Sequence, residues 1–207
     1  MLSALLGTVF DFFKMSLTSF VEIIGVLLSY TGIAFTLLLF VVSILYYLIK
    51  YKVLKKILNE CMLGNYDFVI KRAARLHKIY YSIFRILPTP AIRGNVEYLS
   101  KVLSMAYLAT NDENNFLKHI HILKKDKTFK ELWLSLYYLL KDDTESAMPH
   151  YEHLKALPTA PASLGLLDGI ILAKQGKTDE AQDKFEEVYP KLNYAFTKEI
   201  AARFMQS

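Results

Sequence analysis

The longest uncharged stretch of the chain lies between Glu22 and Lys50. Its 27 positions, residues 23–49, exceed the ~20 apolar residues that a helix needs to cross a bilayer core of ~30 Å. Tyr46, Tyr47 and Tyr51 stand near its C-terminal end, where a spanning helix meets the membrane surface. The pattern predicts a transmembrane helix over residues 23–49, with a buried core helix as the alternative.

The first 22 residues separate apolar from polar positions on two faces of a helix. The apolar positions are Leu2, Leu6, Val9, Phe13 and Phe20, and the polar ones are Thr8, Asp11, Thr18 and Glu22. This favours an amphipathic helix over residues 1–22 lying in the membrane interface. A second spanning helix is the alternative, but Asp11 and Lys14 would then be costly in lipid.

Charges that flank the uncharged stretch predict its orientation. Four lysines follow it, namely Lys50, Lys52, Lys55 and Lys56, whereas Lys14 before it is balanced by Asp11 and Glu22. Because lysine and arginine stay on the cytoplasmic side, we expect a single-pass protein whose domain over residues 50–207 faces the cytoplasm. No basic leader precedes the stretch and no small-residue cleavage site follows it, so we expect the anchor to stay attached.

In the second half of the chain, small, turn and aromatic positions recur at a spacing of 34 residues. One set is Gly169, Leu172, Gly176, Ala181 and Phe185, and the other is Ser135, Tyr138, Asp142, Ala147 and Tyr151. This spacing resembles the tetratricopeptide repeat family, clearly over residues 128–190 and more weakly over 52–125. The resemblance implies antiparallel helix pairs that stack into an α-solenoid. Pro149 falls inside one such helix, which we expect to begin near Ser146 or to kink.

Extending the register upstream places turns at positions 64, 111, 142 and 176 and so predicts about four helix pairs. The first interval is longer than the others, and we assign the extra length to residues 86–91, which hold Pro88 and Pro90. An amphipathic helix from Asn193 to Met205 is expected to cover the last pair. The domain is therefore predicted to be all-α, and an unrelated helical bundle is the alternative to a solenoid.

Composition and charge sharpen this picture. With 53% hydrophobic but also 22% charged residues and a mean hydropathy of +0.23, the apolar excess must be concentrated rather than spread over many spans. Residues 50–93 hold ten Lys/Arg and two Asp/Glu, whereas residues 94–207 hold fourteen and sixteen. We expect the basic segment, and Lys50, Lys52, Lys55 and Lys56 above all, to contact anionic lipid headgroups rather than nucleic acid, for which no fold signature is present.

Motifs of catalysis and metal binding are weak. Gly176-Lys177-Thr178 lacks the glycine that a phosphate loop needs five residues earlier, where Ile171 stands. The pairs His150/His153 and His119/His121 lack further ligands, and the single cysteine, Cys61, excludes an internal disulfide and cysteine-clustered metal sites. A nucleophile built from Cys61 and His77 is less consistent with the apolar surroundings of Cys61 than a buried role. We therefore predict no enzyme, no metal and no cofactor.

The resemblance to the repeat family implies a partner-binding groove along the first helix of each pair. The residues predicted to line it are Tyr98, Met105, Phe129, Leu132, Leu136, Leu166, Ile170 and Lys174, with Leu108 and Leu140 on the same faces. Such an apolar face lacks the charged clamp of the chaperone-binding members and favours an apolar helix or tail as ligand. Contact with the N-terminal helix or with another copy is the alternative, and Trp133 is either a core wedge or an interface anchor.

Two functions fit these expectations. The first is a membrane-anchored adaptor or scaffold that holds a partner protein through the groove. The second is an accessory subunit of a larger membrane complex, which contacts its partners through residues 1–49.

Overall fold

The computed structural model describes residues 22, 25, 29–30, 32–38, 40–41, 47–48, 50–158 and 163–206. The chain divides into two compact units, one ending at Val53 and the other beginning at Leu54. Within the described residues every regular element is a helix, which confirms the all-α prediction.

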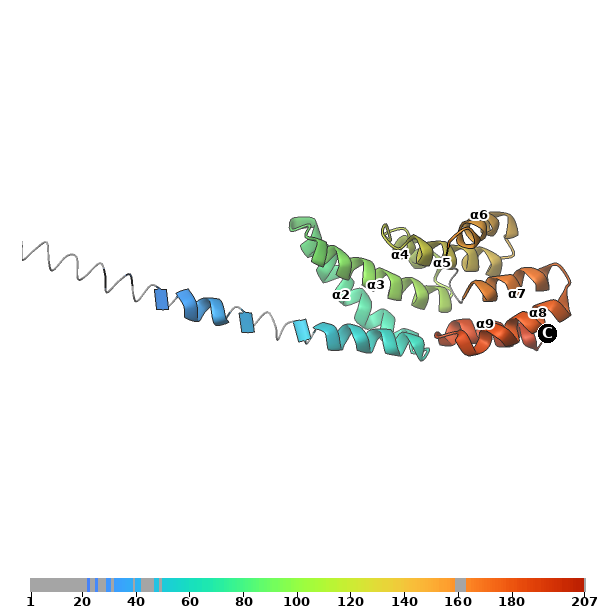
Figure 1. Cartoon of the computed structure of the whole chain (residues 1–207), viewed down its shortest axis with the longest axis horizontal. Helices are drawn as coiled ribbons and strands as arrows, with labels where there is room; N and C mark the ends of the chain where they lie inside the picture. Colours follow the sequence, from blue (N-terminus) through green and yellow to red (C-terminus); the bar gives the residue numbers. More distant parts are fainter. Residues whose placement is uncertain are drawn as a thin grey trace, which may run out of the picture. The chain divides into compact units, whose positions relative to one another are not determined.

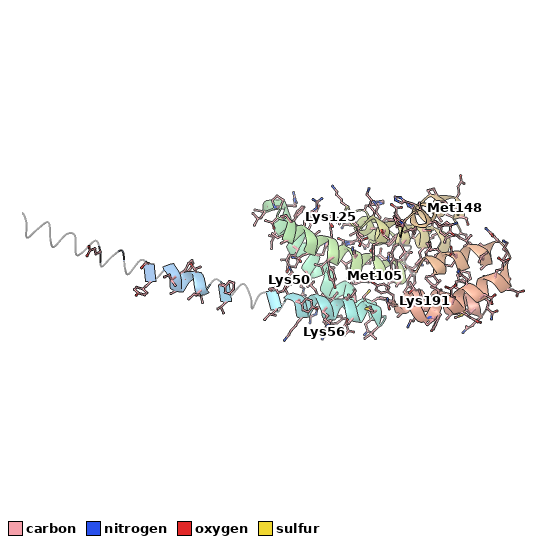
Figure 2. All side chains as sticks on the ribbon, viewed as in Figure 1. Lys50, Lys56, Met105, Lys125, Met148 and Lys191 are labelled. Atoms are coloured by element: carbon pink, nitrogen blue, oxygen red, sulfur yellow. The ribbon has the colours of Figure 1, made fainter. Side chains whose placement is uncertain are left out.

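In the first unit, the described residues from Glu22 to Leu48 are helical, and their side chains stand out from the ribbon (Figure 2). The predicted interfacial helix over residues 1–22 lies outside the described residues apart from Glu22. The predicted spanning segment, residues 23–49, is described only in short runs. Among the residues that are described, no helix combines the length and the apolar character needed to cross a membrane.

The second unit begins with a helical segment, residues 54–62, and continues as a series of helices (Figure 1). These are α2 (Tyr66–Ile86), α3 (Pro90–Ala109), α4 (Glu113–Ile120), α5 (Lys127–Leu140), α6 (Thr144–Lys155), α7 (Leu164–Lys174), α8 (Thr178–Val188) and α9 (Ala195–Met205), with a 3-10 turn at Tyr189–Lys191 before α9. The helices α3 and α4, α5 and α6, and α7 and α8 pack as consecutive pairs, and α7 also contacts α5 and α6.

The four predicted turns are found at their predicted positions. Gly64, Asn111, Asp142 and Gly176 each have a positive φ, of 87°, 60°, 60° and 77°. Glycine adopts this left-handed conformation freely, and asparagine and aspartate are the side chains that tolerate it best. Asp142, which stands 34 residues before Gly176, therefore adopts the same left-handed turn as that glycine.

Aspartates fix where three of the helices begin. The side chains of Asp112, Asp126 and Asp143 accept hydrogen bonds from the backbone N–H groups three residues on, at 3.2, 3.0 and 3.0 Å. Such caps satisfy a donor that the first helical turn leaves unpaired. Because Asp143 caps α6, this helix begins at Thr144 and not near Ser146 as predicted, and Pro149 lies within it.

The extra length between the first two turns is not in the connection assigned to it. Only residues 87–89 separate α2 from α3, and Thr89 caps α3 with Pro90 in its first turn. Instead, α2 and α3 have 21 and 20 residues, against 8 and 14 in α4 and α5. The prolines mark a sharp corner, since a proline at the start of a helix loses no hydrogen bond.

Small residues let the paired helices approach closely. An ideal Cβ placed on Gly169 of α7 would lie 2.6 Å from the Phe185 ring of α8. In the preceding pair, the hydroxyl of Ser135 is buried and donates to the carbonyl of Ala147 at 3.5 Å. The predicted close-contact positions of the second half of the domain therefore lie at helix–helix contacts.

Helix α9 covers the last pair, as predicted, and extends further. It contacts α7 and α8, and Phe204 stacks on Phe185 with ring centroids 5.4 Å apart. At its N-terminal end, Phe196 stacks on Trp133 of α5, and Ala195 lies beside the turn at Gly64. One short helix thus joins the last pair to the middle of the domain and to the first turn.

Candidate functional site

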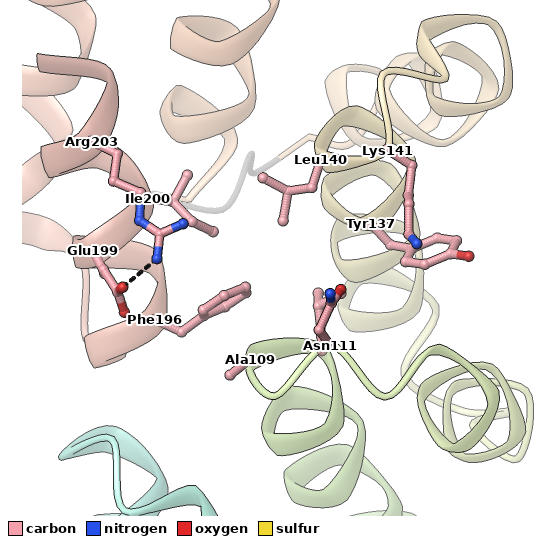
Figure 3. Close-up of a pocket in the computed structure, with 10 residues that line it drawn as sticks. Ala109, Asn111, Tyr137, Leu140, Lys141, Phe196, Glu199, Ile200 and Arg203 are labelled. Carbon is pink, nitrogen blue, oxygen red and sulfur yellow. Dashed lines mark hydrogen bonds and ion pairs between the residues drawn. The ribbon is translucent and has the colours of Figure 1, made fainter. Parts of the chain in front are cut away.

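An open groove of about 560 Å³ lies between α9 and the C-terminal ends of α3 and α5 (Figure 3). We call it the α9 groove. Its lining residues are Leu108 and Ala109 from α3 with Asn111 from the turn after it, Tyr137 and Leu140 from α5 with Lys141 directly after it, and Phe196, Glu199, Ile200 and Arg203 from α9.

The turns that follow α3 and α5 shape one wall of the α9 groove. Asn111 and Asp142 reverse the chain directly after these helices, and Asn111 and Lys141 line the groove at these two ends. The last carbonyl groups of a helix carry a partial negative charge. Lys141, the residue after α5, complements that charge and places a cation at the rim.

The middle of the α9 groove is apolar. Leu140 is 37% exposed, which is unusual in a domain whose other leucines on α5 are largely covered. Its side chain points across the groove toward Ile200 of α9 (Figure 3). An apolar side chain of a ligand placed against Leu140 would remove the surface of that leucine from water, which is the main source of affinity in such contacts, whereas Ile200 is 4% exposed and forms the buried floor of the groove.

Charged groups stand on both walls. Arg203 pairs with Glu199 at 2.5 Å, and Lys141 pairs with Glu113 at 2.9 Å. The side chain of Arg203 is 75% exposed, and exposed pairs of this kind contribute about 0–1 kcal/mol to stability. Arg203 can therefore turn to a ligand carboxylate with little loss to the fold.

Beside the groove, Tyr137 donates a hydrogen bond to Glu113. Burial, and then this hydrogen bond, raise the pKa of Tyr137. Hydrogen bonds from Tyr137 and Lys141 lower the pKa of Glu113. Both shifts move the pKa values away from neutral pH, so Tyr137 stays neutral and Glu113 stays charged. Such groups are suited to positioning a ligand rather than to proton transfer.

The structure places half of the predicted groove residues in the core. Met105 (Figure 2), Leu136, Leu166 and Ile170 are at most 3% exposed. Side chains with so little surface cannot line an open groove in this conformation. In this structure these four residues belong to the core, and partner binding along the first helices of the pairs stays a prediction.

The other four predicted residues are also engaged within the domain. Tyr98 donates to the carbonyl of Leu54 at 3.2 Å, and Lys174 forms an ion pair with Asp142. Phe129 contacts Trp133, with ring centroids 5.7 Å apart. Leu132 lines a smaller pocket of about 180 Å³ between α5 and the segment before α9.

Helix α9 and the segment before it cover Trp133 of α5. Tyr194 and Phe196 pack on Trp133 with ring centroids 6.0 and 6.4 Å apart, and Trp133 is only 2% exposed. Trp133 is therefore a core wedge, the first of the two predicted roles. Of the predicted faces, the part that reaches the α9 groove lies at the C-terminal ends of α3 and α5. Leu108 and Leu140 line the groove there.

The lysines predicted to contact lipid lie along residues 50–56, which are all helical. Lys52, Lys55 and Lys56 are exposed, and Lys50 is half-buried. Lys56 lies over the ring of Phe68, 5.6 Å from its centroid. These side chains have the exposure that a headgroup contact requires.

Two buried histidines form a contact that the sequence did not reveal. His77 of α2 and His119 of α4 lie with ring centroids 4.7 Å apart, and Nε2 of His77 is 3.0 Å from the hydroxyl of Ser100. Burial is the main cause that lowers both pKa values, that of His119 to about 4. The rings come from separate helices, and no spacing along the chain signals their meeting.

Cys61 lies apart from this chemistry. Its Sγ is 4.0 Å from the carbonyl oxygen of Val102, and burial raises the pKa of the thiol to about 12. A thiol of this pKa is a poor nucleophile at neutral pH. Among the described residues, no cluster of three His, Cys, Asp or Glu side chains could hold a metal ion.

A comparison with protein-family models, curated proteins and solved structures gives no match for this chain.

Proposed function

We propose that this protein is a membrane-anchored adaptor that binds an apolar segment with acidic residues, from another protein, in the α9 groove. The observation that carries this proposal is the groove itself, in which apolar Leu140 and Ile200 are flanked by Lys141 and Arg203. Apolar anchors give affinity to a peptide or helix in a groove, and charges at the rim select its partner.

The second unit is proposed to be a solenoid similar to tetratricopeptide repeats. Support comes from the four left-handed turns at the register positions and from the close contact of Gly169 with Phe185. Successive pairs also contact each other through α5, α6 and α7. Stacking of this kind buries faces that a single helix pair leaves open.

The anchor is proposed to be the uncharged segment, residues 23–49. Among the residues described there, Phe35, Leu38 and Phe40 are 62%, 59% and 63% exposed. A run of exposed apolar side chains is unfavourable in water and favourable in lipid. The hydroxyl of Thr36 donates to the carbonyl of Gly32 at 2.8 Å, so this polar group is already paired, as a lipid environment demands.

We further propose that residues 1–22 lie in the interface and that the second unit faces the cytoplasm. The support is the pattern of charges, with Lys50, Lys52, Lys55 and Lys56 directly after the segment. These lysines would meet the anionic headgroups of the same leaflet, at about 1 kcal/mol for each well-placed charge.

The experiment that tests the adaptor proposal is a quantitative affinity purification of the full chain from its own membranes. Leu140→Glu places a negative charge in the groove, where it opposes an acidic ligand and removes the apolar contact. Because Leu140 is already 37% exposed, the fold should tolerate the change. We expect the variant to lose the groove-bound partner and to keep the melting temperature of the parent chain.

The matched control is Leu63→Glu, the same substitution at a residue that is 72% exposed and outside the groove. It should retain every partner. Loss of the same partner from both variants, or from neither, would remove the α9 groove as the binding site.

The alternative is an accessory subunit of a membrane complex that binds through residues 1–49. It is favoured by Gly25 and Gly32, seven residues apart, where no atom lies within 4 Å of an added Cβ. Small residues on one face let membrane helices approach each other closely. Purification in a mild detergent separates the two functions, because stoichiometric membrane-spanning partners that survive Leu140→Glu would favour the second.

A further inference from the structure

Exposed apolar side chains cluster where α2 turns into α3. Ile86 is 86% exposed and Leu87 is 55% exposed, and Ile83 and Ile79, one and two turns earlier, are 40% and 50% exposed. We call residues 79–92 the α2–α3 corner. Apolar residues that lie singly on a surface are ordinary, but a contiguous group at the tip of two long helices marks a contact surface.

The α2–α3 corner lies at the end of the second unit where the chain enters. Tyr98 bonds to the carbonyl of Leu54, and Val102 lies beside Cys61, so α3 runs parallel to residues 54–62. Pro90 stands eight residues before Tyr98, and α3 therefore extends about 12 Å beyond the level of Leu54, at 1.5 Å for each residue. The corner therefore lies at the same end of the second unit as Leu54, the first residue of that unit.

The distance to the proposed anchor is short. Residues 50–53 are all that separates Leu54 from the uncharged segment. Four residues span at most about 14 Å even when fully extended. If residues 23–49 cross the bilayer, the corner lies within reach of its surface.

The surroundings of the corner are basic. In α2, Lys71, Arg72, Arg75, Lys78 and Arg85 are exposed and Asp67 is the only acidic residue. Beside the corner, a pocket of about 460 Å³ carries Arg93, Lys118 and Lys124 around apolar Phe84 and Ile122. Its one carboxylate, Glu97, is paired with Arg93 at 3.3 Å, which leaves a net positive charge.

We propose that the α2–α3 corner is a second membrane contact, in which Ile86 and Leu87 insert into the interface and the neighbouring cations bind phosphates of anionic lipids. Apolar side chains ringed by lysine and arginine are the chemistry of a surface that lies in a membrane interface. This inference rests on the proposed anchoring of residues 23–49. It adds a fixed orientation, because an anchor and a second contact together would hold the α9 groove at a defined height above the bilayer.

The test uses the full chain reconstituted into vesicles, with a polarity-sensitive maleimide probe on an introduced cysteine. Ile86→Cys reports from the corner, and Leu63→Cys, at the turn near the other end of α2, is the matched control. The buried native Cys61 reacts poorly because of its raised pKa, and the parent chain measures any labelling of it. In vesicles of phosphatidylcholine with phosphatidylglycerol, we expect the probe at Ile86→Cys to shift its emission to shorter wavelength and to be quenched by spin-labelled lipids.

The control and the lipid composition decide the outcome. The probe at Leu63→Cys should show neither effect, and pure phosphatidylcholine should weaken both effects at Ile86→Cys. Equal quenching at the two positions, or no quenching at Ile86→Cys in protein that floats with the vesicles, would overturn the corner contact and leave the anchor intact. A blue shift that persists in detergent and resists the lipid quencher would assign the corner to a protein contact instead. Protein that fails to float would overturn the anchor, and the corner contact with it.

Discussion

Gly169 shows how one missing side chain sets the distance between two helices. A Cβ at this position would lie 2.6 Å from the Phe185 ring, well inside van der Waals contact. The fully buried Phe185 is itself stacked on Phe204 and has little room to move. We expect Gly169→Ala to lower the free energy of unfolding by about 1–3 kcal/mol and the melting temperature by about 2–4 °C for each kcal/mol.

Gly94→Ala is the control for Gly169→Ala. Gly94 lies within α3, and no atom lies within 4 Å of an added Cβ. Alanine favours a helix over glycine by about 1 kcal/mol, so Gly94→Ala should leave the melting temperature unchanged or raise it. Circular dichroism at 222 nm during heating measures both variants, and a similar loss in the two would contradict the packing argument.

His119 predicts a pH dependence of stability. Its ring is 5% exposed, between the rings of His77 and Tyr107, and burial, His77 and Lys118 lower its pKa to about 4. Between the ordinary histidine pKa of about 6.5 and the folded value, the unfolded chain binds a proton that the folded chain does not. The free energy of unfolding should therefore fall as pH falls through this range, by about 1 kcal/mol for each pH unit.

Urea unfolding at pH 7 and pH 5, followed by Trp133 fluorescence in detergent, measures this slope. His119→Phe keeps an aromatic ring beside Tyr107 and should reduce the slope, with the remainder due to His77. His121→Phe alters an exposed histidine two residues away and should keep the slope of the parent chain. An unchanged slope in His119→Phe would show that His119 does not carry the effect.

At the scale of the elements, α9 is the helix that closes the predicted groove. Phe196 stacks on Trp133, the only tryptophan of the chain. Because Phe196 is half-buried, we expect Phe196→Ala to cost about 2 kcal/mol, below the range for a fully buried phenylalanine. The loss of this cover should also shift the emission of Trp133 to longer wavelength.

Phe204→Ala removes the other aromatic contact of α9. Phe204 packs on Phe185, so Phe204→Ala should be less stable, while the fluorescence emission of Trp133 in the folded chain stays the same. The two variants together distinguish the effect of the N-terminal end of α9 from that of its C-terminal end. If Phe196→Ala leaves the Trp133 emission unchanged, the proposed closing of the groove by this helix is wrong.

The elements show why sequence predicted the turns and missed the groove. Gly64, Asn111, Asp142 and Gly176 are local signals, because the backbone conformation of a turn restricts its own residue type. Periodicity also identified the face of α5 that holds Leu136, and the end of the chain that forms α9. The periodic pattern does not reveal the contact between Trp133 and Phe196, because these residues are 63 positions apart in the chain. Phe196 also lines the α9 groove, so the location of that groove depends on a contact that the sequence pattern does not reveal.

The sequence pattern did not predict the length of α2 and α3, for a related reason. Pro88 and Pro90 predict an inserted loop, but a proline in the first turn of a helix is also compatible with a tight corner. The added residues continue the helical pattern of both helices up to the corner. A proline pair therefore shows where the chain turns, and not how long the neighbouring helices are.

At the scale of the whole molecule, the uneven charge predicts topology. The excess of lysine and arginine follows the uncharged segment at once, whereas residues 94–207 are slightly acidic. Positive residues within about 15–20 residues of a span dominate its orientation. A reporter fused after Ser207 should therefore be active only in the cytoplasm.

The lysines themselves can be tested against the rest of the domain. Replacing Lys50, Lys52, Lys55 and Lys56 by alanine removes the positive charge beside the segment and should give a mixed orientation of the reporter. Replacing Lys177, Lys184, Lys191 and Lys198 by alanine removes the same charge much further along the chain and should leave the reporter cytoplasmic. Equal effects of the two sets would mean that total charge, rather than its position, controls the orientation. A reporter of the parent chain that is active only outside the cytoplasm would reverse the topology and place the α9 groove before a different class of partner.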